Sequence, residues 1–510
     1  MRTPATFDTL RGFCIGGIRM VVVIGGGSAG LGVAWDLLLR QIPVTVVESG
    51  PMGRGTSGRF HGLLHSGARY AVVDPVSAEQ CRAENARLRH IAPSAIEAVE
   101  GYFVSVDEVG ESYAQEWLKG AAAANIPVEE VSRDRVLEHL PGLTPDVRQS
   151  FRVHDAVLEG FKLLEMLTTN IRSRGGTVLQ EASVTAVHTV NGRVSGVVVR
   201  ADGEDRVIPC DAVINAGGPW AFQVAQLFQD HLDMQLSSGL MMIYANRMVP
   251  HVVNRLAPPG DGDIFVPHGN TVILGTTEVP QNTADPVEPT RREAQYLQSL
   301  GAQLFPEIVR WRVLRAFTGV RPLFQGSSLA PHSRVSRDFT VVDHGATVGF
   351  QGAFSIVGGK WTTFRLMAER TGDAVAAYLR VHVPSTTADV VLTPPETQKR
   401  QHTGALVCEC ETVGVGDLEP RLSEPLADWR TRTWWAMGPC QGTVCAHRGI
   451  ALRIPHDGVL AALQDLREFR AERERGMRPV AWGDNARQWA LNHAVTGQTL
   501  AEGAVRKIGD

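Results

Sequence analysis

The chain has 510 residues, of which 44% are hydrophobic and 20% are charged, with a formal net charge of −4 at pH 7. These proportions are ordinary for a globular protein with sizeable cores, and nothing in them indicates nucleic-acid binding. No run of about 18 uninterrupted apolar residues occurs, so we expect no membrane-spanning helix.

The first 19 residues lie before the first predicted strand and are not expected to belong to a folded domain. Met20 directly precedes the strand-like run VVVIGGG. Residues 1–19 are therefore expected to form a poorly ordered N-terminal extension, or to result from a misassigned start codon.

Residues 20–49 predict a strand, a glycine-rich turn, a helix and a second strand. Gly25, Gly27 and Gly30 follow the first strand in the spacing GxGxxG, and Glu48 ends the second strand. In such a unit the glycines allow a tight turn and close approach of a pyrophosphate to the helix N-terminus, while the acid accepts hydrogen bonds from a ribose. The pattern predicts a bound dinucleotide.

The chain then returns to this nucleotide fold twice. NAGG (215–218) follows a buried strand and contains Gly217, and SIVGGKWTT (355–363) contains Gly358, Gly359 and Thr362 before a long helix. A Gly-Gly turn that opens a helix can direct backbone N–H groups at a flavin ring. The arrangement resembles the FAD-binding glutathione-reductase-like fold, an α/β Rossmann-like class, and FAD is the expected cofactor.

The segments between these returns predict an interleaved substrate domain. Helical patterns at 78–92 and 161–175 are followed by alternating strands with turns at Asn191-Gly192 and at residues 201–205, which indicates an antiparallel meander. We expect an FAD-binding region over 20–383, whose substrate part covers about 80–200 and 230–345.

The C-terminal part carries four of the seven cysteines. Residues 384–405 read as a linker; Cys408-x-Cys410 and Cys440-x4-Cys445 then lie within 406–460, and 461–510 read as a helical extension. Four thiolates suit either a [2Fe–2S] cluster or a structural zinc, and zinc more often uses CxxC knuckles. The spacing resembles the bacterioferritin-associated-ferredoxin-like [2Fe–2S] domain.

Further motifs resemble one family, the FAD-dependent glycerol-3-phosphate dehydrogenases. They are GTSGRFHGLLHSGARY (55–70), GTTE (275–278), TGVRPL (318–323), SRD (336–338) and GGKWTTFRLMAE (358–369). The cysteine module and RPVAWGD (478–484) narrow the resemblance to the large catalytic A subunits of the anaerobic members. The resemblance implies oxidation of sn-glycerol 3-phosphate to dihydroxyacetone phosphate by hydride transfer to FAD.

The resemblance also implies roles for single residues. Arg321 would lie near the reacting carbon and Lys360 beside the flavin, while Arg69 and Arg337 would bind phosphate, for which the planar guanidinium is well suited. The 55–70 loop is expected to supply further contacts. Thr56 and Ser57 would contact the flavin, and His65 and Tyr70 would lie in the substrate pocket. Two alternatives stay open for His65: a catalytic or substrate-binding role, or a role in holding the loop in place by hydrogen bonds.

The electron acceptor is expected to be another protein. The resemblance implies transfer through the iron–sulfur cluster and partner subunits to a quinone, with the chain held in the cytoplasm at the inner face of the membrane by those partners. Two other functions stay open: a flavin enzyme for another small hydroxy acid or amine, and a non-catalytic electron-transfer subunit. One departure from the family is Ser238-Gly239, where relatives often have Lys-Gly.

Overall fold

The computed structural model describes residues 19–324, 338–395 and 403–499. A six-stranded sheet in the order β20-β21-β13-β1-β2-β9 forms the nucleotide-binding part. Its first strands are buried runs of valine, as parallel strands covered on both faces require. The strands are β1 (Val21–Ile24), β2 (Val44–Val47), β9 (Thr177–Leu179), β13 (Ala212–Asn215), β20 (Phe339–Asp343) and β21 (Ala353–Gly358).

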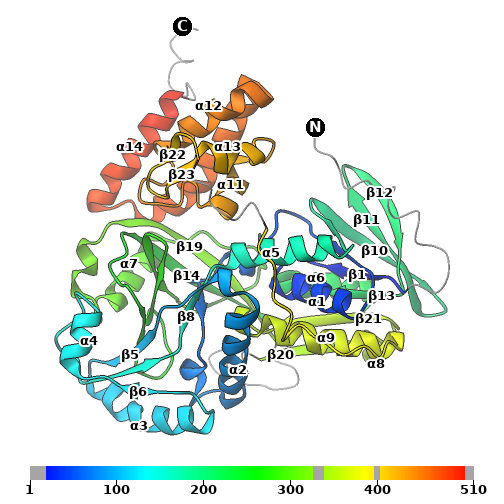
Figure 1. The fold of residues 1–510 in the computed structure, drawn as a ribbon, viewed down its shortest axis with the longest axis horizontal. Coiled ribbons are helices and arrows are strands. Elements are labelled where there is room, and N and C mark those ends of the chain that lie inside the picture. The colour runs from blue at the N-terminus through cyan, green and yellow to red at the C-terminus, as the bar shows by residue number, and fades with distance from the viewer. Residues whose placement is uncertain (1–18, 325–337, 396–402, 500–510) are drawn as a thin grey trace.

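Helices cover this sheet, and only its edge strand β20 runs antiparallel to its neighbour. In Figure 1 helices α1 and α9 lie side by side against the sheet, and α5 lies close to α1. The helices are α1 (Ser28–Leu39), α5 (Gly160–Ser173), α6 (Ala221–Ala225), α8 (His344–Thr347) and α9 (Phe364–Leu379). The predicted strand–turn–helix units at 20–49 and 355–379 are confirmed.

The predicted antiparallel meander is also confirmed, but it lies on the nucleotide-binding part. It consists of β10 (Ala182–Val190), β11 (Arg193–Ala201) and β12 (Glu204–Pro209). Its inner side chains, such as Val197, share a core with Val22 and Val47. The substrate part expected over about 80–200 therefore differs from the structure, because β9 and the meander pack on the parallel sheet.

A nine-stranded sheet forms the second part of the molecule. It runs in the order β18-β14-β17-β16-β15-β5-β7-β6, and β19 pairs with β14 along its length. Its strands are β5 (Gly101–Ser105), β6 (Glu129–Glu130), β7 (Gln149–Val153), β14 (Met234–Ala245), β15 (Val252–Arg255), β16 (Ile264–His268), β17 (Thr271–Gly275), β18 (Val279–Gln281) and β19 (Val313–Phe324).

Helices and a small sheet complete this part and connect it to the first. The helices are α2 (Pro75–Ile91), α3 (Glu108–Ala123), α4 (Arg133–His139) and α7 (Arg291–Gly301). The small sheet, in the order β3-β8-β4, consists of β3 (Leu63–Leu64), β8 (Ala156–Leu158) and β4 (Ile96–Glu97).

Residues 403–499 form a C-terminal module with its own core around Trp429, Trp435 and Phe469. Figure 1 shows the module seated over the sheet that contains β14 and β19. Its elements are β22 (Leu406–Cys408), β23 (Val413–Gly414), α10 (Val415–Leu418), α11 (Leu426–Thr433), α12 (Cys445–Asp457), α13 (Val459–Met477) and α14 (Gly483–Thr499). Helix α13 contributes Phe469 to this core, so the expected boundary at residue 460 divides one packed unit.

The beginning of the expected linker, residues 384–395, packs on the core of the six-stranded sheet. Leu392 is buried and its N–H donates to the carbonyl oxygen of Ile91 at 2.8 Å.

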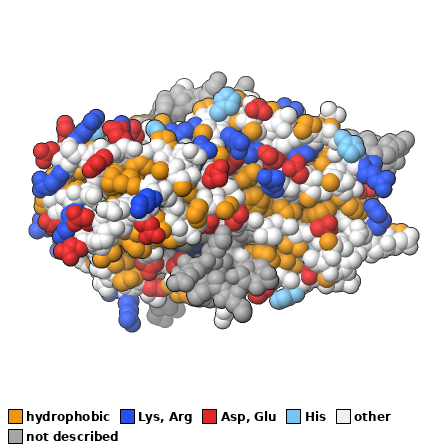
Figure 2. Space-filling model, turned by 90° about the horizontal axis from the view of Figure 1, so that it is seen from below, with side chains coloured by type: hydrophobic (Ala, Val, Ile, Leu, Met, Phe, Trp, Pro, Cys, Tyr) orange, Lys and Arg blue, Asp and Glu red, His pale blue; other side chains and the backbone are white. Residues whose placement is uncertain are grey.

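On the face seen in Figure 2, acidic and basic side chains are interspersed and do not form a patch of one sign. No helix of the described residues is long and apolar enough to cross a membrane.

Candidate functional site

A cavity of about 450 Å³ opens at the carboxyl ends of β1 and β2, where α1 begins. Gly25, Gly27 and Glu48 line one side of it, and Gly217 lines another. Ligands of parallel α/β sheets bind at this edge, because the strands end there and helix N-termini point into the same space. Three of the residues predicted for a dinucleotide therefore lie together as expected from their spacing.

The turn between β1 and α1 requires its glycines. Gly25 has φ +115°, a left-handed conformation that favours glycine. A Cβ at Gly30 would lie 2.0 Å from the carbonyl oxygen of Gly25, which is backbone and cannot yield. Gly30 does not line the cavity; it lets the helix approach the strand, as the fingerprint predicts.

Glu48 is held at the rim of the cavity by backbone amides. The N–H of Gly26 donates to Oε2 at 2.6 Å and the N–H of Gly50 donates to Oε1 at 3.0 Å. Burial raises the pKa of this carboxyl, and the two amides oppose that shift. A carboxylate oxygen has more than one acceptor position, so Glu48 can also accept a hydroxyl hydrogen bond.

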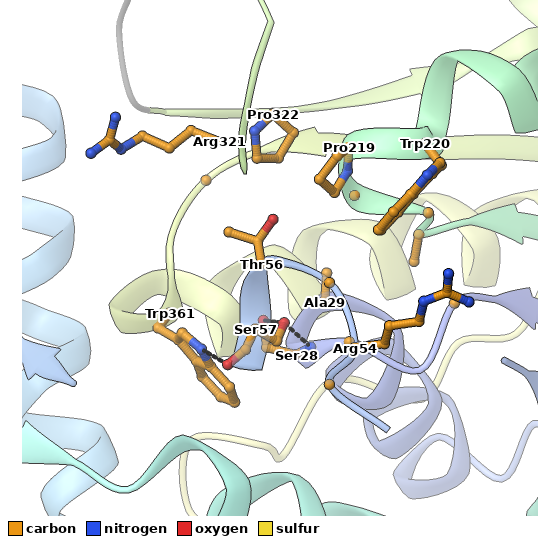
Figure 3. A pocket seen from close by; sticks show the side chains of 18 of the residues that line it. Ser28, Ala29, Arg54, Thr56, Ser57, Pro219, Trp220, Arg321, Pro322 and Trp361 are labelled. Carbon is orange, nitrogen blue, oxygen red and sulfur yellow. Dashed lines mark hydrogen bonds between the residues drawn. The ribbon is translucent and has the colours of Figure 1, made fainter. Parts of the chain in front are cut away.

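The loop 55–70 crosses the start of α1. The N–H of Ser28 donates to Oγ of Ser57 at 3.0 Å, and Trp361 Nε1–H donates to the carbonyl oxygen of Ser57 at 3.0 Å. Figure 3 shows these side chains on one side of the cavity, with Arg321 and Pro322 across from them. Thr56 and Ser57 both line the cavity.

The turn that leads into helix α9 closes the same cavity from a third side. Gly358, Gly359, Lys360 and Thr362 line it. Oγ1 of Thr362 accepts a hydrogen bond from the N–H of His65 at 3.1 Å, although 297 residues separate them. The two glycine-rich turns and the 55–70 loop therefore meet around one space.

A second cavity of about 110 Å³ adjoins the first. The two cavities share lining residues, namely Thr56, Phe60, His61, His65, Tyr70 and Arg321. The second cavity is also lined by Arg69, Asp261 and Glu278. It contains polar groups of both signs and is the size of a small polar molecule, whereas the first is larger and mostly apolar.

Arg321 lies on β19 at the boundary between the two cavities. Its Nη2 donates to the carbonyl oxygen of Thr277 at 3.0 Å and contacts Oγ1 of Thr276; its Nη1 donates to Oγ of Ser237 at 3.4 Å. A Cβ at Gly239 would lie 2.4 Å from Nη2. Gly239, the residue after the departure from the family at Ser238, therefore makes room for the guanidinium.

Arg69 is paired with a carboxylate that the sequence did not indicate. Its Nη1 lies 2.8 Å from Oδ2 of Asp263, and its Nη2 donates to Oδ1 at 2.9 Å. Burial opposes the charge of Arg69, but Asp263 outweighs it and raises the pKa of the guanidinium. Asp263 was missed because 194 residues separate the pair and nothing local marks it.

Lys360, Tyr70 and His65 are stacked beside the shared wall. Nζ of Lys360 donates to Oγ of Ser77 at 3.0 Å and lies 4.6 Å from the ring centroid of Tyr70. The ring centroids of Tyr70 and His65 are 5.2 Å apart, and His65 is buried. This cation–aromatic stack orients the ammonium group. Arg337, the remaining predicted phosphate ligand, lies outside the described residues.

The four cysteines meet in the C-terminal module. Cys445 makes side-chain hydrogen bonds with both Cys408 and Cys440, and Cys440 makes one with Cys410. These bonds and the backbone N–H groups around the sulfurs lower the pKa of Cys408 to about 7 and that of Cys440 to about 5. In the described parts of the chain, no group of three or more His, Cys, Asp or Glu side chains is placed to hold a metal ion.

The cysteine loops contact the hairpin between β16 and β17. Nδ2 of Asn270 donates to the carbonyl oxygen of Cys410 at 2.7 Å. The ring of Trp434 meets His268 edge-on, with 4.6 Å between centroids. His268 is 3.2 Å from the position of a Cβ on Gly62, within the 55–70 loop. The four-cysteine region is thus packed on the segment that leads to the shared wall of the two cavities.

Comparison with known proteins agrees with this architecture. Residues 20–365 match the family model described as "FAD dependent oxidoreductase". The chain is 34% identical to the A1 subunit of anaerobic glycerol-3-phosphate dehydrogenase from Haloferax volcanii, over 94% of this chain and 90% of that protein. It is 33% identical to the A subunit of the Escherichia coli (strain K12) enzyme, over 92% of this chain and 94% of that protein.

A solved structure has the same fold over nearly the whole chain. It is the glycerol-3-phosphate dehydrogenase of Bacillus halodurans in complex with FAD, with a TM-score of 0.58 and 21% sequence identity. The match covers 98% of this chain and 92% of that one. At this identity the likeness concerns the fold.

Proposed function

The chain belongs to the family of FAD-dependent oxidoreductases that includes the A subunits of anaerobic glycerol-3-phosphate dehydrogenases, and from this premise we propose that it oxidises sn-glycerol 3-phosphate to dihydroxyacetone phosphate. The observation that carries the proposal is the pair of adjoining cavities. One is built for a dinucleotide, the other is small and polar, and Arg321 stands at their common wall.

The residues of the larger cavity fit FAD. The glycine-rich turn leaves backbone N–H groups at the start of α1 for a pyrophosphate, and Glu48 stands where a ribose would follow. Gly358, Gly359 and Thr362 would hold the ring from the start of α9, with Thr56 and Ser57 opposite. When bound, FAD supplies the acceptor for a hydride from carbon.

The smaller cavity would hold the phosphate ester. Arg321 supplies a guanidinium whose orientation is fixed by Thr276 and Thr277, so it loses little freedom when it binds an anion. Arg69 supplies a second cation, although Asp263 already compensates its charge. We therefore expect Arg321 to contribute more to binding than Arg69, and we propose Arg337 as a third phosphate ligand.

The chain's own residues would also assist the loss of the hydroxyl proton. Lys360 is oriented by Ser77 and Tyr70, and His65 lies in the same wall. Cations near the reacting oxygen stabilise the negative charge that develops there. Arg321 and Lys360 would supply this stabilisation, and His65 is the candidate acceptor for the proton.

The C-terminal module would hold a [2Fe–2S] cluster through Cys408, Cys410, Cys440 and Cys445. What supports this is the donor set: the four thiols act on one another, lowering the pKa of Cys408 and Cys440 and raising that of Cys410 and Cys445. Electrons would leave through partner subunits to a quinone, with the chain at the inner face of the membrane. The names of the relatives, which are A subunits, support partner subunits.

An anaerobic visible spectrum of the purified holoenzyme tests the reaction. Glycerol 3-phosphate is expected to bleach the oxidised-flavin band, whereas glycerol at the same concentration is not, because it lacks the phosphate dianion. The Arg321→Gln variant should retain its flavin and fail to bleach. If the flavin stays oxidised with saturating ester, the substrate is another hydroxy acid or an amine, or the chain only transfers electrons.

A further inference from the structure

A third cavity, of about 340 Å³, lies in the seam between the C-terminal module and the rest of the chain. The 55–70 loop contributes Arg59 and Phe60 to its lining, and β19 contributes Arg315. The module contributes Arg430 from α11 and Glu472 from α13. The proposed reaction does not take place in this cavity, although Arg59 and Phe60 also line the smaller cavity proposed for the substrate.

Arginines crowd around a single carboxylate at one end of this cavity. Nη2 of Arg315 lies 3.3 Å from Oε1 of Glu472, and Nη1 of Arg430 lies 2.7 Å from Oε2. Nε of Arg473 lies 3.9 Å from the same Oε2. In the parts of the chain that the structure describes, Glu472 is the one carboxylate within ion-pair distance of these arginines.

Arg59 adds a fourth cation with no ion pair among the described residues. Its Nε–H donates to the carbonyl oxygen of Arg54 at 3.4 Å, a neutral acceptor. Burial lowers the pKa of Arg59; Glu472 opposes this shift, while the neighbouring Arg315 and Arg430 add to it. Burial and the neighbouring Arg430 also lower the pKa of Arg315, in spite of Glu472. The cluster thus holds four guanidinium groups against one carboxylate.

Glu165, another acid that lines the cavity, pairs with arginines outside this cluster. It lies 3.4 Å from Nη1 of Arg432 and 3.8 Å from Nη2 of Arg421. Nε of both Arg315 and Arg473 is buried and has no hydrogen-bond partner among the residues that the structure describes. Unpaired positive charge in a partly buried space is costly, and an anion would offset that cost.

We propose that the seam cavity is a binding site for an oxyanion of the phosphate class, held by Arg59, Arg315 and Arg430. Planar guanidinium groups suit the oxygens of such an anion, and they come from both sides of the seam. A bound anion would therefore tie the four-cysteine module to the loop that lines the flavin cavity. The ligand would be inorganic phosphate or the phosphate group of a small monoester.

Equilibrium dialysis of the holoenzyme against labelled inorganic phosphate tests the site, with chloride holding the ionic strength constant. The Arg321→Gln background is used, because it removes the principal phosphate ligand of the substrate cavity. One phosphate per chain is expected to bind in this background. Adding Arg315→Gln and Arg430→Gln should abolish it. A matched control for the single change Arg315→Gln is Arg310→Gln, an exposed arginine that pairs with Glu307 on the surface; it also removes one positive charge and should leave binding unchanged.

Glu472→Gln gives a test that misfolding cannot imitate. It removes the competing carboxylate, so the dissociation constant for phosphate should fall by at least about threefold. Competition with unlabelled glycerol 3-phosphate distinguishes the source: displacement at lower concentration than by phosphate identifies a monoester site. The proposal is overturned if the Arg321→Gln protein binds no phosphate, or if Arg310→Gln weakens binding as much as Arg315→Gln. Because no turnover is measured, this result is independent of the proposed reaction.

Discussion

Arg321 owes its position to a residue on the neighbouring strand that has no side chain. Ser237 faces Arg321 across the β14–β19 ladder, and Gly239, two residues further, leaves the space that the guanidinium occupies. The hydrogen bonds to Thr276 and Thr277 then hold it at the wall of both cavities. A single missing Cβ thus decides where the main cation of the site lies.

Gly239→Ala is therefore expected to damage the site without damaging the fold. The new Cβ would push Nη2 away from Thr277, and kcat/KM for glycerol 3-phosphate should fall by about 10- to 100-fold, as for loss of one oriented charge-assisted contact. Steady-state kinetics measures this, and the flavin content should not change. Gly497→Ala, whose Cβ would come no nearer than 3.8 Å to another atom, is the control. Unaltered kcat/KM in Gly239→Ala would contradict the role of Arg321.

The pKa of His268 makes the stability of the protein depend on pH. Burial, together with nearby Arg247, lowers its pKa to about 4. In the unfolded chain the imidazole has its ordinary pKa of 6.5, so folding with a neutral His268 becomes less favourable as the pH falls from 6.5 toward 4. Stability linked to this group is fully present above pH 6.5.

His268→Phe removes this titration, while the new ring can still pack on Trp434. The difference in urea midpoint between the variant and the wild type should therefore shift in favour of the variant between about pH 8 and about pH 5. Urea unfolding followed by tryptophan fluorescence measures it at both values. A difference that does not change with pH would show that His268 is protonated equally in the folded and unfolded chains.

At the scale of elements, the site depends on three loops that follow strands far apart in the sequence. The turn before α1, the loop 55–70 and the turn before α9 converge because β1, β2 and β21 are parallel strands of one sheet. Parallel strands bring their carboxyl ends to a common edge. Each loop carries its own glycines, but these local motifs do not bring the loops together. The order of the strands in the sheet does.

Gly30→Val tests the closest of these approaches. A side chain at Gly30 would collide with the backbone oxygen of Gly25, 2.0 Å from the Cβ position, and would force α1 away from the turn. We expect the purified variant to contain less than about a tenth of the wild-type FAD, since the lost phosphate contacts lie at the helix N-terminus. Flavin absorbance per chain measures this. Normal FAD content would mean that the turn tolerates a wider helix–strand spacing.

At the scale of the whole molecule, the C-terminal module contacts the rest of the chain at the β16–β17 hairpin and at the seam. Asn270 binds the backbone of Cys410, Trp434 packs on His268, and the arginine cluster spans the seam. Cys410 therefore contacts the body of the protein at the β16–β17 hairpin. Such an arrangement suits a centre that exchanges electrons with the flavin-side part.

Cys408→Ser and Cys440→Ser test that centre. Each should lower the iron content from about two atoms per chain to near zero, because a [2Fe–2S] cluster needs four thiolates. Elemental analysis measures it, and zinc in place of iron would identify the structural alternative. Cys210→Ser, a buried cysteine outside the module, is the control. Bleaching of the flavin by substrate should survive in both variants, since the cavities lie outside the module.

The sequence by itself determined the features that depend on residues close together along the chain. The GxGxxG turn, Glu48, the Gly-Gly turn before α9 and the cysteine spacings are local patterns whose chemistry follows from their residue types. The meander was also predictable, because its turns and alternation are local. The extent of the substrate part was not, because the packing of Val197 on Val22 is a contact between distant segments.

Only the tertiary structure decided which distant side chains meet. Asp263 pairs with Arg69, Gly239 makes room for Arg321, and Glu472 meets Arg315 of the seam across 157 residues. None of these pairs has a spacing that a helix or hairpin would reveal. Charge compensation acts through space, so the polarity of a cavity becomes known only when the chain is folded around it.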